Sequence, residues 1–267
     1  MTIKVFATDM DGTFLNDQNS YDRVYFNQLF AQLTDQDMHF VAISGNQYYQ
    51  IAGFFEDYQD KMTIVGENGA YIVDKGQLLK SYPLPNDIVE TVIAYLDRNQ
   101  LSSEAVVCGE SSAYILASSS QENKDYFSIY YTRLEEVASF QELPQDKILK
   151  FSFNTPLDVT DEIIKVLNET LSGQVQAVAT GHGNVDVIGT GVNKGTALTY
   201  LLDHWGLKAT NLVAFGDSDN DLEMLKLTDN SYAMLNANEN VKKVATYQTT
   251  TNNENGVLVV IDKLIRR

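Results

Sequence analysis

The chain has 267 residues, and 44% of them are hydrophobic, which is enough for a substantial core in one large domain or two modest ones. Its formal net charge of −17 repels phosphate groups and so argues against nucleic acid or an anionic membrane as a partner. The single cysteine, Cys108, excludes a disulfide framework and a cysteine-rich metal site. Because we find no apolar leader and no bilayer-spanning stretch, we expect a cytoplasmic protein, with a monomer slightly favoured over an oligomer.

The N-terminal part of the chain alternates short apolar runs with helical patterns. Residues 3–7, 40–43 and 63–65 predict buried strands, a helix is expected through residues 51–55, and a hairpin over residues 71–82. An earlier helix should present one apolar stripe, made of Val24, Tyr25, Leu29, Phe30 and Leu33. Wholly apolar strands that alternate with helices are typical of a parallel sheet covered on both faces. We therefore predict an α/β fold with a Rossmann-like parallel sheet at its core.

The alternation of short apolar runs with helical patterns changes near residue 83, which indicates an inserted domain. The segment Pro83-Leu84-Pro85 holds two of the four prolines of the chain. Proline stiffens a connection and cannot donate to a sheet ladder, so we place a domain boundary there. We expect the insert to span residues 83–189, between core segments 1–82 and 190–267.

The insert has the pattern of an α+β domain with an antiparallel sheet. Its predicted elements are a helix over 88–96, strands over 106–108 and 114–116, a helix over 126–131, a strand over 149–153, a helix over 159–167, and strands over 175–179 and 185–188. We expect His182, which lies between two glycines, in an exposed loop. Asp186 precedes the return to the core, which we place at Gly189-Thr190-Gly191.

The alternation of short apolar runs with helical patterns resumes after the insert. A helix is expected to begin near Asn193-Lys194, followed by a fourth apolar run at residues 212–215. Short strands near residues 232–234 and 245–247, with helices between and after them, should complete the core.

Polar clusters follow three of the apolar runs. These clusters are Asp9 with Asp11, then Ser44-Gly45-Asn46, and then the segment Gly216 to Asp221. Because the carboxyl ends of parallel strands meet at one edge of a sheet, we expect the three clusters to converge, and Lys194 to reach the same edge. Asp9 and Asp11 alternate along an extended chain and so face one side, where their repulsion calls for a cation.

Taken singly, each feature has an ordinary explanation. Lysines such as Lys194 are mostly solvated, Ser44-Gly45 suits a plain turn, and acids in residues 216–221 suit a helix N-terminus. Together they suit phosphoryl transfer, because carboxylates bind Mg²⁺ and one carboxylate can attack phosphorus. A second acid two residues away can protonate the leaving oxygen and later deprotonate water. Lysine, hydroxyl and N–H groups would stabilise the phosphoryl oxygens.

This set of motifs resembles the haloacid dehalogenase superfamily, specifically its Cof-type phosphatases of subfamily IIB, which carry an inserted α+β cap of the C2B type. The four motifs are matched by Asp9-Met10-Asp11-Gly12-Thr13, by Ser44, by Lys194 and by Gly216 to Asp221. The resemblance implies that Asp9 is the nucleophile and Asp11 the general acid/base. It assigns phosphoryl or substrate binding to Ser44, Gly45, Asn46, Lys194 and Asn220, and Mg²⁺ binding to Asp9, the Asp11 carbonyl, Asp217 and Asp221. Many relatives have Thr-Gly-Arg in place of Ser44-Gly45-Asn46, so an arginine contact is missing here.

The resemblance implies a Mg²⁺-dependent phosphatase with a cap that selects the substrate. The segments around Asp9 and Ser44 are similar to those of a sugar phosphatase group in this branch, which predicts small hexose or pentose monophosphates as substrates. Two alternatives use the same fold. One is a phosphomutase or phosphotransferase, in which a sugar accepts the phosphoryl group, and the other is a phosphoaccepting signalling module without turnover.

Overall fold

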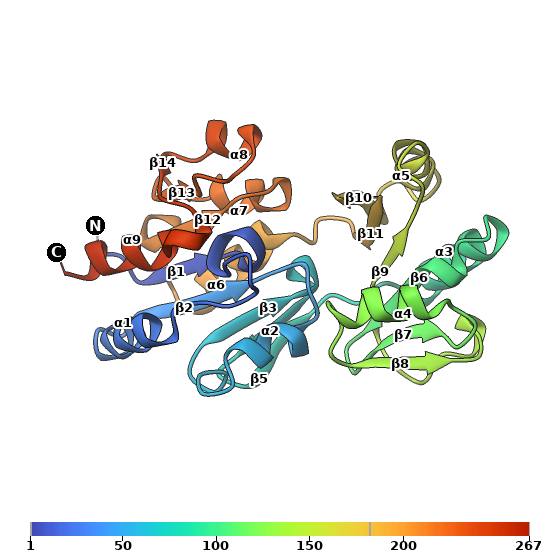
Figure 1. The fold of residues 1–267 in the computed structure, drawn as a ribbon, viewed down its shortest axis with the longest axis horizontal. Coiled ribbons are helices and arrows are strands. Elements are labelled where there is room, and N and C mark those ends of the chain that lie inside the picture. The colour runs from blue at the N-terminus through green and yellow to red at the C-terminus, as the bar shows by residue number, and fades with distance from the viewer. Residues whose placement is uncertain (1, 182, 267) are drawn as a thin grey trace. The chain divides into compact units, whose positions relative to one another are not determined.

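The computed structural model describes residues 2–181 and 183–266, which form two compact units (Figure 1). The core unit comprises the chain up to Leu79 and again from Asn193, and the insert unit comprises Lys80–Val192. His182 lies outside the described residues. Among those residues, no helix has both the length and the apolar character needed to cross a membrane.

The core unit is built on an eight-stranded sheet, counted over the described residues, in the order β14-β13-β12-β1-β2-β3-β4-β5. Its strands are β1 (Val5–Thr8), β2 (His39–Ile43), β3 (Thr63–Gly66), β4 (Tyr71–Asp74), β5 (Gln77–Ser81), β12 (Leu212–Gly216), β13 (Ser231–Ala233) and β14 (Tyr247–Gln248). The strands from β14 to β3 pair in parallel, and β4 pairs antiparallel with β3. The expected α/β fold with a parallel core sheet is therefore confirmed.

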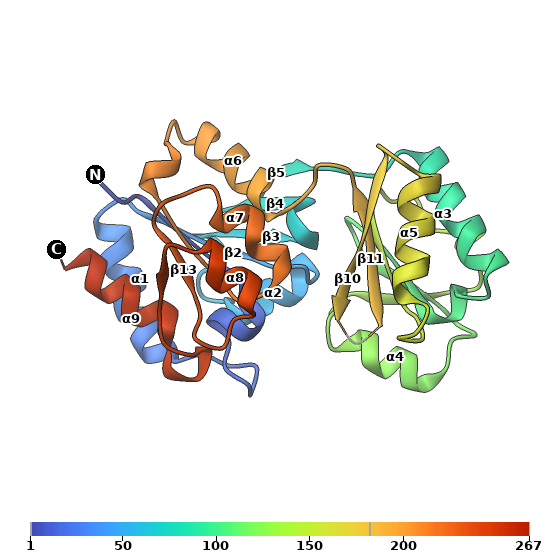
Figure 2. The same cartoon turned by 90° about the horizontal axis from the view of Figure 1, so that it is seen from above.

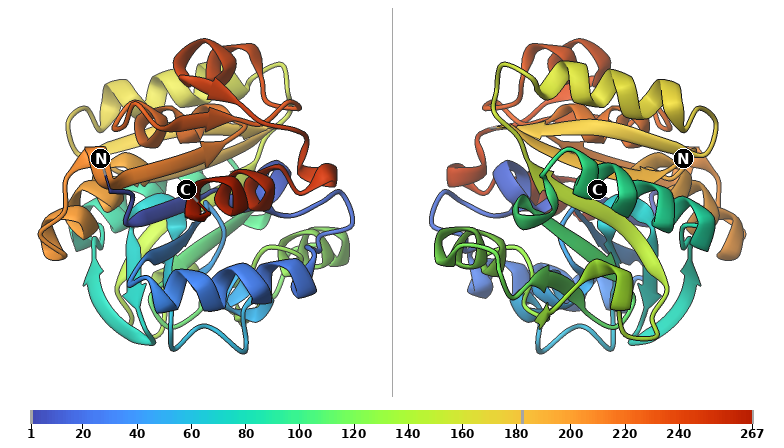
Figure 3. Two further views of the ribbon diagram at one scale, coloured as in Figure 1. Left: turned by 90° about the vertical axis from the view of Figure 1, so that its left-hand side faces the viewer. Right: turned by 90° about the vertical axis from the view of Figure 1, so that its right-hand side faces the viewer.

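Helices cover both faces of this sheet. They are α1 (Arg23–Asp35), α2 (Tyr48–Phe54), α6 (Lys194–His204), α7 (Leu222–Leu225), α8 (Glu239–Val244) and α9 (Gly256–Ile265). Figure 2 shows α1 and α9 on one face and α6 on the other. Figure 3 (left) shows α9 beside α1, where the Tyr25 hydroxyl donates to Asp262 Oδ2 at 3.1 Å.

The buried stripe of α1 differs from the predicted stripe at two residues, because Tyr25 is only half-buried and Val24 is exposed. Val24 is 71% exposed, and Phe26 takes its place beside Leu29, Phe30 and Leu33. The reason is that Asp22 caps the helix by accepting from the amide of Tyr25, which fixes the start of α1 and turns Val24 outward. The ring of Phe26 contacts that of Phe14 edge-on at 5.5 Å, so this cluster also anchors the turn that follows β1.

The insert unit contains a six-stranded sheet, counted over the described residues, in the order β10-β11-β9-β6-β7-β8. Its elements are α3 (Asn86–Arg98), β6 (Ala105–Gly109), β7 (Ala113–Leu116), α4 (Gln121–Ser128), β8 (Leu134–Val137), β9 (Ile148–Asn154), α5 (Thr160–Thr170), β10 (Val175–Gly181) and β11 (Asn184–Gly189). The prediction of a purely antiparallel sheet is wrong in one place, because β8 pairs with β7 in parallel. Helix α4 also lies earlier than predicted, because Ser120 caps its start.

Candidate active site

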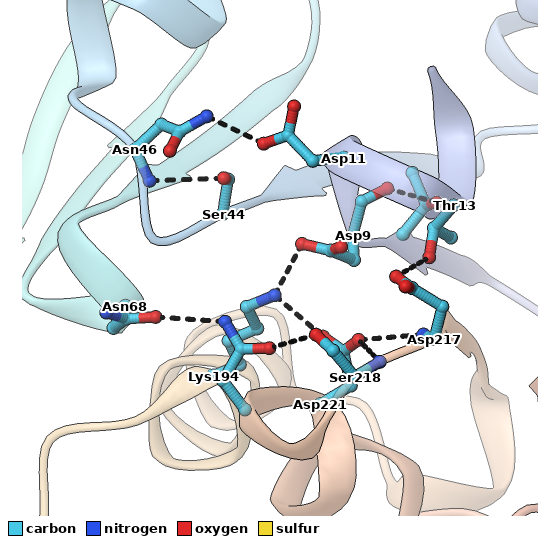
Figure 4. Close-up of polar contacts among 12 residues, drawn as sticks. Asp9, Asp11, Thr13, Ser44, Asn46, Asn68, Lys194, Asp217, Ser218 and Asp221 are labelled. Carbon is cyan, nitrogen blue, oxygen red and sulfur yellow. Dashed lines mark hydrogen bonds and ion pairs between the residues drawn. The ribbon is translucent and has the colours of Figure 1, made fainter. Parts of the chain in front are cut away.

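The polar clusters that follow β1, β2 and β12 lie together at one edge of the core sheet (Figure 4). These three strands are neighbours, and in the parallel register Thr8 lies opposite Phe215 on one side and Ala42 on the other. The next residues of each strand therefore reach the same edge, which brings Asp9, Ser44 and Asp217 together. The convergence depends on the sheet, because these residues are far apart in the sequence.

Lys194 connects two of these clusters. Its Nζ atom lies 2.5 Å from Asp9 Oδ1 and 2.6 Å from Asp221 Oδ1, and its side chain is 0% exposed. Lys194 is the first residue of α6, whose N-terminus is fixed by a capping box between Asn193 and Thr196. The ammonium group is thus a buried bridge between two carboxylates and not a solvated helix residue.

The segment after β12 is folded around the carboxylate of Asp221. Asp221 Oδ2 accepts from the backbone amides of Asp217 at 2.9 Å and Ser218 at 3.1 Å. The carboxylate of Asp217 in turn accepts from the hydroxyl of Thr13 at 2.8 Å. Gly12 has φ +73°, and a Cβ atom there would come within 2.7 Å of Asp217 Oδ2, so the turn needs glycine at this position.

Asp11 points away from the Lys194 bridge. Its Oδ2 atom accepts from the side-chain amide of Asn46 at 2.7 Å (Figure 4). The backbone amide of Asn46 is held by Ser44 Oγ at 3.1 Å. Asp9 and Asp11 therefore occupy different environments although only one residue separates them.

Asn68 is a neighbour that the sequence reasoning did not identify. It follows β3, it is 5% exposed, and its side-chain oxygen accepts from Asn220 Nδ2 at 3.3 Å. Its backbone amide donates to the carbonyl of Ser44 at 3.0 Å, and a Cβ atom on Gly45 would lie 3.0 Å from its side-chain oxygen. The sequence did contain a signal for Asn68, because this residue follows the apolar run at residues 63–65, just as Ser44 follows the run at residues 40–43.

Burial and neighbouring charges shift the pKa values of the acids and the lysine in this site. Burial and the charge of Asp221 raise the pKa of Asp9 well above its usual range, and Lys194 opposes that rise. Burial alone would lower the pKa of Lys194, but the carboxylates of Asp221 and Asp9 raise it, so the lysine stays charged. Desolvation raises the pKa of Asp11 against the effect of the Asn46 hydrogen bond.

The carboxylates also fit a metal ion. Asp9, Asp217 and Asp221 each offer a ligand oxygen, and these atoms lie within 4.8 Å of one another. An all-oxygen set of few carboxylates is what Mg²⁺ uses when it keeps several waters. The donor set of this chain therefore matches the expected ion.

The Lys194 bridge should dominate the stability of the core unit. Replacing Lys194 by Met leaves two buried carboxylates without their cation, and we expect it to lower the free energy of unfolding by about 3–5 kcal/mol. Adding Asp221→Asn to that variant should recover part of the loss. The matched control is Lys226→Met, which breaks an exposed pair with Glu223 and should cost less than about 1 kcal/mol. Urea unfolding in EDTA measures all three, and equal losses for the two lysine variants would contradict the bridge.

Stability without metal should fall as pH rises. Burial and the charge of Asp221 raise the pKa of Asp217 from 3.8 to about 6. The folded chain then binds more protons than the unfolded chain between those values, so this contribution is complete below pH 4 and is lost as pH passes 6. Relative to Asp217→Asn, the wild type should lose on the order of 2 kcal/mol across this window. Unfolding curves of both proteins in EDTA test this, and a constant difference at all pH values would refute it.

Several known proteins are similar to this chain in sequence and in fold. The haloacid dehalogenase-like hydrolase family matches residues 6–261. A 5-amino-6-(5-phospho-D-ribitylamino)uracil phosphatase of Escherichia coli (strain K12) is 38% identical over 266 residues, which covers 100% of this chain and 97% of that protein. A phosphatase of the same substrate from Bacillus subtilis (strain 168) is 26% identical and covers 98% of both chains. A crystal structure from Streptococcus mutans UA159 has a TM-score of 0.92 at 38% identity and covers 100% of both chains. With this likeness along its whole length, the chain belongs to the Cof-type haloacid dehalogenase-like hydrolases and is a phosphatase that acts on phosphoric monoesters.

Proposed function

We propose that the chain hydrolyses small monophosphate esters with Mg²⁺, through a phosphate ester on Asp9. The observation that carries this proposal is the contrast between two nearby acids. Asp9 is 5% exposed and its carboxylate is paired with Lys194 at 2.5 Å, whereas Asp11 is exposed and accepts from Asn46. Lys194 favours the ionised form of Asp9, as a nucleophile requires, whereas Asp11 pairs with a neutral amide and its pKa is raised by desolvation, which suits it to carry a proton.

The proposed reaction has two steps. In the first, an oxygen of Asp9 attacks phosphorus, the bond from phosphorus to the ester oxygen breaks, and Asp11 gives its proton to the leaving oxygen. In the second, Asp11 takes a proton from a water molecule whose oxygen attacks phosphorus, the bond from phosphorus to the Asp9 oxygen breaks, and the Asp9 carboxylate is regenerated as inorganic phosphate leaves. Ser44 with the N–H groups around Gly45 would stabilise the charge on the phosphoryl oxygens.

Mg²⁺ is the proposed cofactor. Asp9 and Asp217 would hold it together with the Asp11 carbonyl, and Asp221 would support the set through the amides that it binds. When bound, the ion supplies positive charge that offsets the repulsion among the carboxylates and the substrate phosphate.

The insert unit is proposed to act as the cap that selects the substrate. A second phosphate would require free cations, preferably arginine. Residues 84–188 contain six cations, namely Arg98, Lys124, Arg133, Lys147, Lys150 and Lys165. Four of the six lie in ion pairs with carboxylates, including a buried pair between Lys150 and Asp186 at 3.0 Å. This supports a monophosphate with a neutral body.

Two substrate groups share the chemistry that we expect. Hexose and pentose monophosphates are the first, from the resemblance of the motifs. The phosphorylated ribitylaminouracil is the second, because the relative that is 38% identical is named for it. Both have one phosphate ester on a carbon skeleton that carries several hydroxyl groups. A phosphotransferase would use the same first step, and labelled phosphate recovered on an added free sugar would indicate it.

The covalent mechanism is tested by three aspartate variants. Asp9→Asn keeps the shape but removes the nucleophile, so turnover should fall by at least about 10³-fold, a loss near 4 kcal/mol in barrier. Asp11→Asn should also lose turnover and accumulate phosphoenzyme with a substrate whose leaving group needs no proton. Asp219→Asn is the control, because Asp219 is exposed and its carboxylate faces Asn238 and Asn240. Near-normal turnover by Asp9→Asn would end the covalent proposal.

Mg²⁺ should stabilise the folded chain. An ion that binds only the folded state raises the free energy of unfolding by about 2.7 kcal/mol at a hundredfold excess over its dissociation constant. We expect the melting temperature to rise with millimolar Mg²⁺ at pH 7 and to rise less in Asp217→Asn. A melting temperature that Mg²⁺ leaves unchanged, together with full activity in EDTA, would refute the metal site.

Substrate preference is tested by specificity constants across a panel. The panel compares ribose 5-phosphate, hexose 6-phosphates, the phosphorylated ribitylaminouracil, a sugar bisphosphate and a nucleotide. We expect the monophosphates with hydroxylated chains to lead. A bisphosphate or nucleotide preferred tenfold, about 1.4 kcal/mol in the barrier, would show that the insert unit reads charge and not hydroxyl groups.

A further inference from the structure

The amide of Asn46 contacts the carboxylate of Asp11, the proposed general acid/base. Asn46 Nδ2 donates to Asp11 Oδ2 at 2.7 Å, and Figure 4 shows the two side chains directed toward each other. Asp11 itself is exposed and lies in a turn with a non-helical backbone at φ −73° and ψ 126°. An exposed carboxylate without a partner samples several rotamers, so this contact restricts where its proton can be delivered.

The loop that carries Asn46 is itself held from several sides. The backbone amide of Asn46 donates to Ser44 Oγ at 3.1 Å, and its carbonyl accepts from the amide of Glu67 at 3.0 Å. A Cβ atom on Gly66 would lie 3.2 Å from that carbonyl and 2.8 Å from the amide nitrogen of Tyr48. The close approach of β3 to this loop leaves Asn46 little freedom, so its side chain is presented from a fixed position.

The chemistry of an amide suits this place. The side chain of asparagine has a donor and an acceptor, so by turning over it can pair with either a carboxylate or a carboxylic acid. A general acid/base passes through both forms in each turnover. A lysine or arginine has donors and no acceptor, so it could not accept a hydrogen bond from the O–H of the carboxylic acid.

We propose that Asn46 is a positioning residue that aims Asp11 at the leaving oxygen and then at the attacking water. The proposal rests on the proposed function, in which Asp11 transfers the proton in both steps. Asn46 was expected from the sequence to bind substrate, and this inference gives it a different task. It also separates the two halves of the Ser44-Gly45-Asn46 segment, since Ser44 is proposed to bind the phosphoryl oxygens while Asn46 acts through Asp11.

The test uses two substrates that differ in their need for an acid. The p-nitrophenyl group leaves without protonation, whereas an alkoxide such as that of a hexose 6-phosphate needs a proton. In Asn46→Ala, the p-nitrophenol burst should stay within about twofold of the wild-type rate at saturating substrate. Phosphorylation by the hexose phosphate and hydrolysis of the phosphoenzyme should each slow by about tenfold, the size of one hydrogen bond to a charged group. The phosphoenzyme should then accumulate in the p-nitrophenyl phosphate reaction.

Two further variants keep the result interpretable. Asn46→Leu has nearly the same shape and loses the donor without adding a charge, so it should show the same difference between the two substrates even if the alanine variant folds poorly. Asn240→Ala removes a similar exposed contact, from Asn240 Nδ2 to Asp219 Oδ1 at 3.1 Å, and should leave both rates unchanged. If Asn46→Leu and Asn46→Ala slow both substrates equally, or neither, the positioning role is overturned.

Asp11→Asn, measured in parallel, separates this inference from the proposed function. If Asp11→Asn discriminates between the two substrates and the Asn46 variants do not, the proposed function stands and the inference fails. If Asp11→Asn does not discriminate, Asp11 is not the acid/base and the proposed function fails first. The inference is supported if the variants at both residues slow the hexose phosphate more than p-nitrophenyl phosphate and the loss is smaller for the Asn46 variants than for Asp11→Asn.

Discussion

The buried ammonium of Lys194 is the interaction on which the site depends. It lies within 2.6 Å of carboxylates from two different segments, and its side chain is fully shielded from solvent. The desolvation of such a group is offset only when the partners are well placed, so the ends of β1, β12 and α6 must come together with little tolerance. Strands β1 and β12 are also buried at every position, and α6 buries Ala197, Leu198, Leu201 and Leu202. Packing and charge therefore constrain the same backbone.

The arrangement separates two chemically identical side chains. Asp9 and Asp11 are aspartates one residue apart, yet one lies against a lysine in a buried site and the other lies against an amide near solvent. The chain leaves the strand direction between the two residues, because β1 ends at Thr8 and a turn with non-helical angles at Asp11 and Gly12 follows. The edge of the sheet brings together residues that are far apart in the sequence. The turn after β1 directs two nearby side chains to different surroundings. In the proposed function, the nucleophile and the proton carrier therefore come from one short segment of the chain.

Much of this fold and site can be predicted from the sequence, because the core strands are short, wholly apolar and followed by polar residues. That pattern is enough to assign Asp9, Ser44, Lys194 and Asp217 to one edge of the sheet. Other features leave no such pattern. Strand β8 contains Glu135 and Glu136 and has no apolar run, since it is an edge strand with exposed positions. The contact between Asn46 and Asp11 depends on side-chain directions that spacing does not encode. The prediction for Val24 is wrong because hydrophobicity alone does not say where a helix begins.

The order of strands also determines when the site can form as the chain is made. Strand β1 pairs with β2, which follows within about forty residues, and with β12, whose first residue is Leu212. Until that part has been synthesised, one edge of the central strand has no partner and is open to pairing with other chains. The insert unit, by contrast, is one continuous segment that can fold as soon as it has left the ribosome. Its strands have all their partners within that segment, so they can pair before the second part of the core unit has been synthesised.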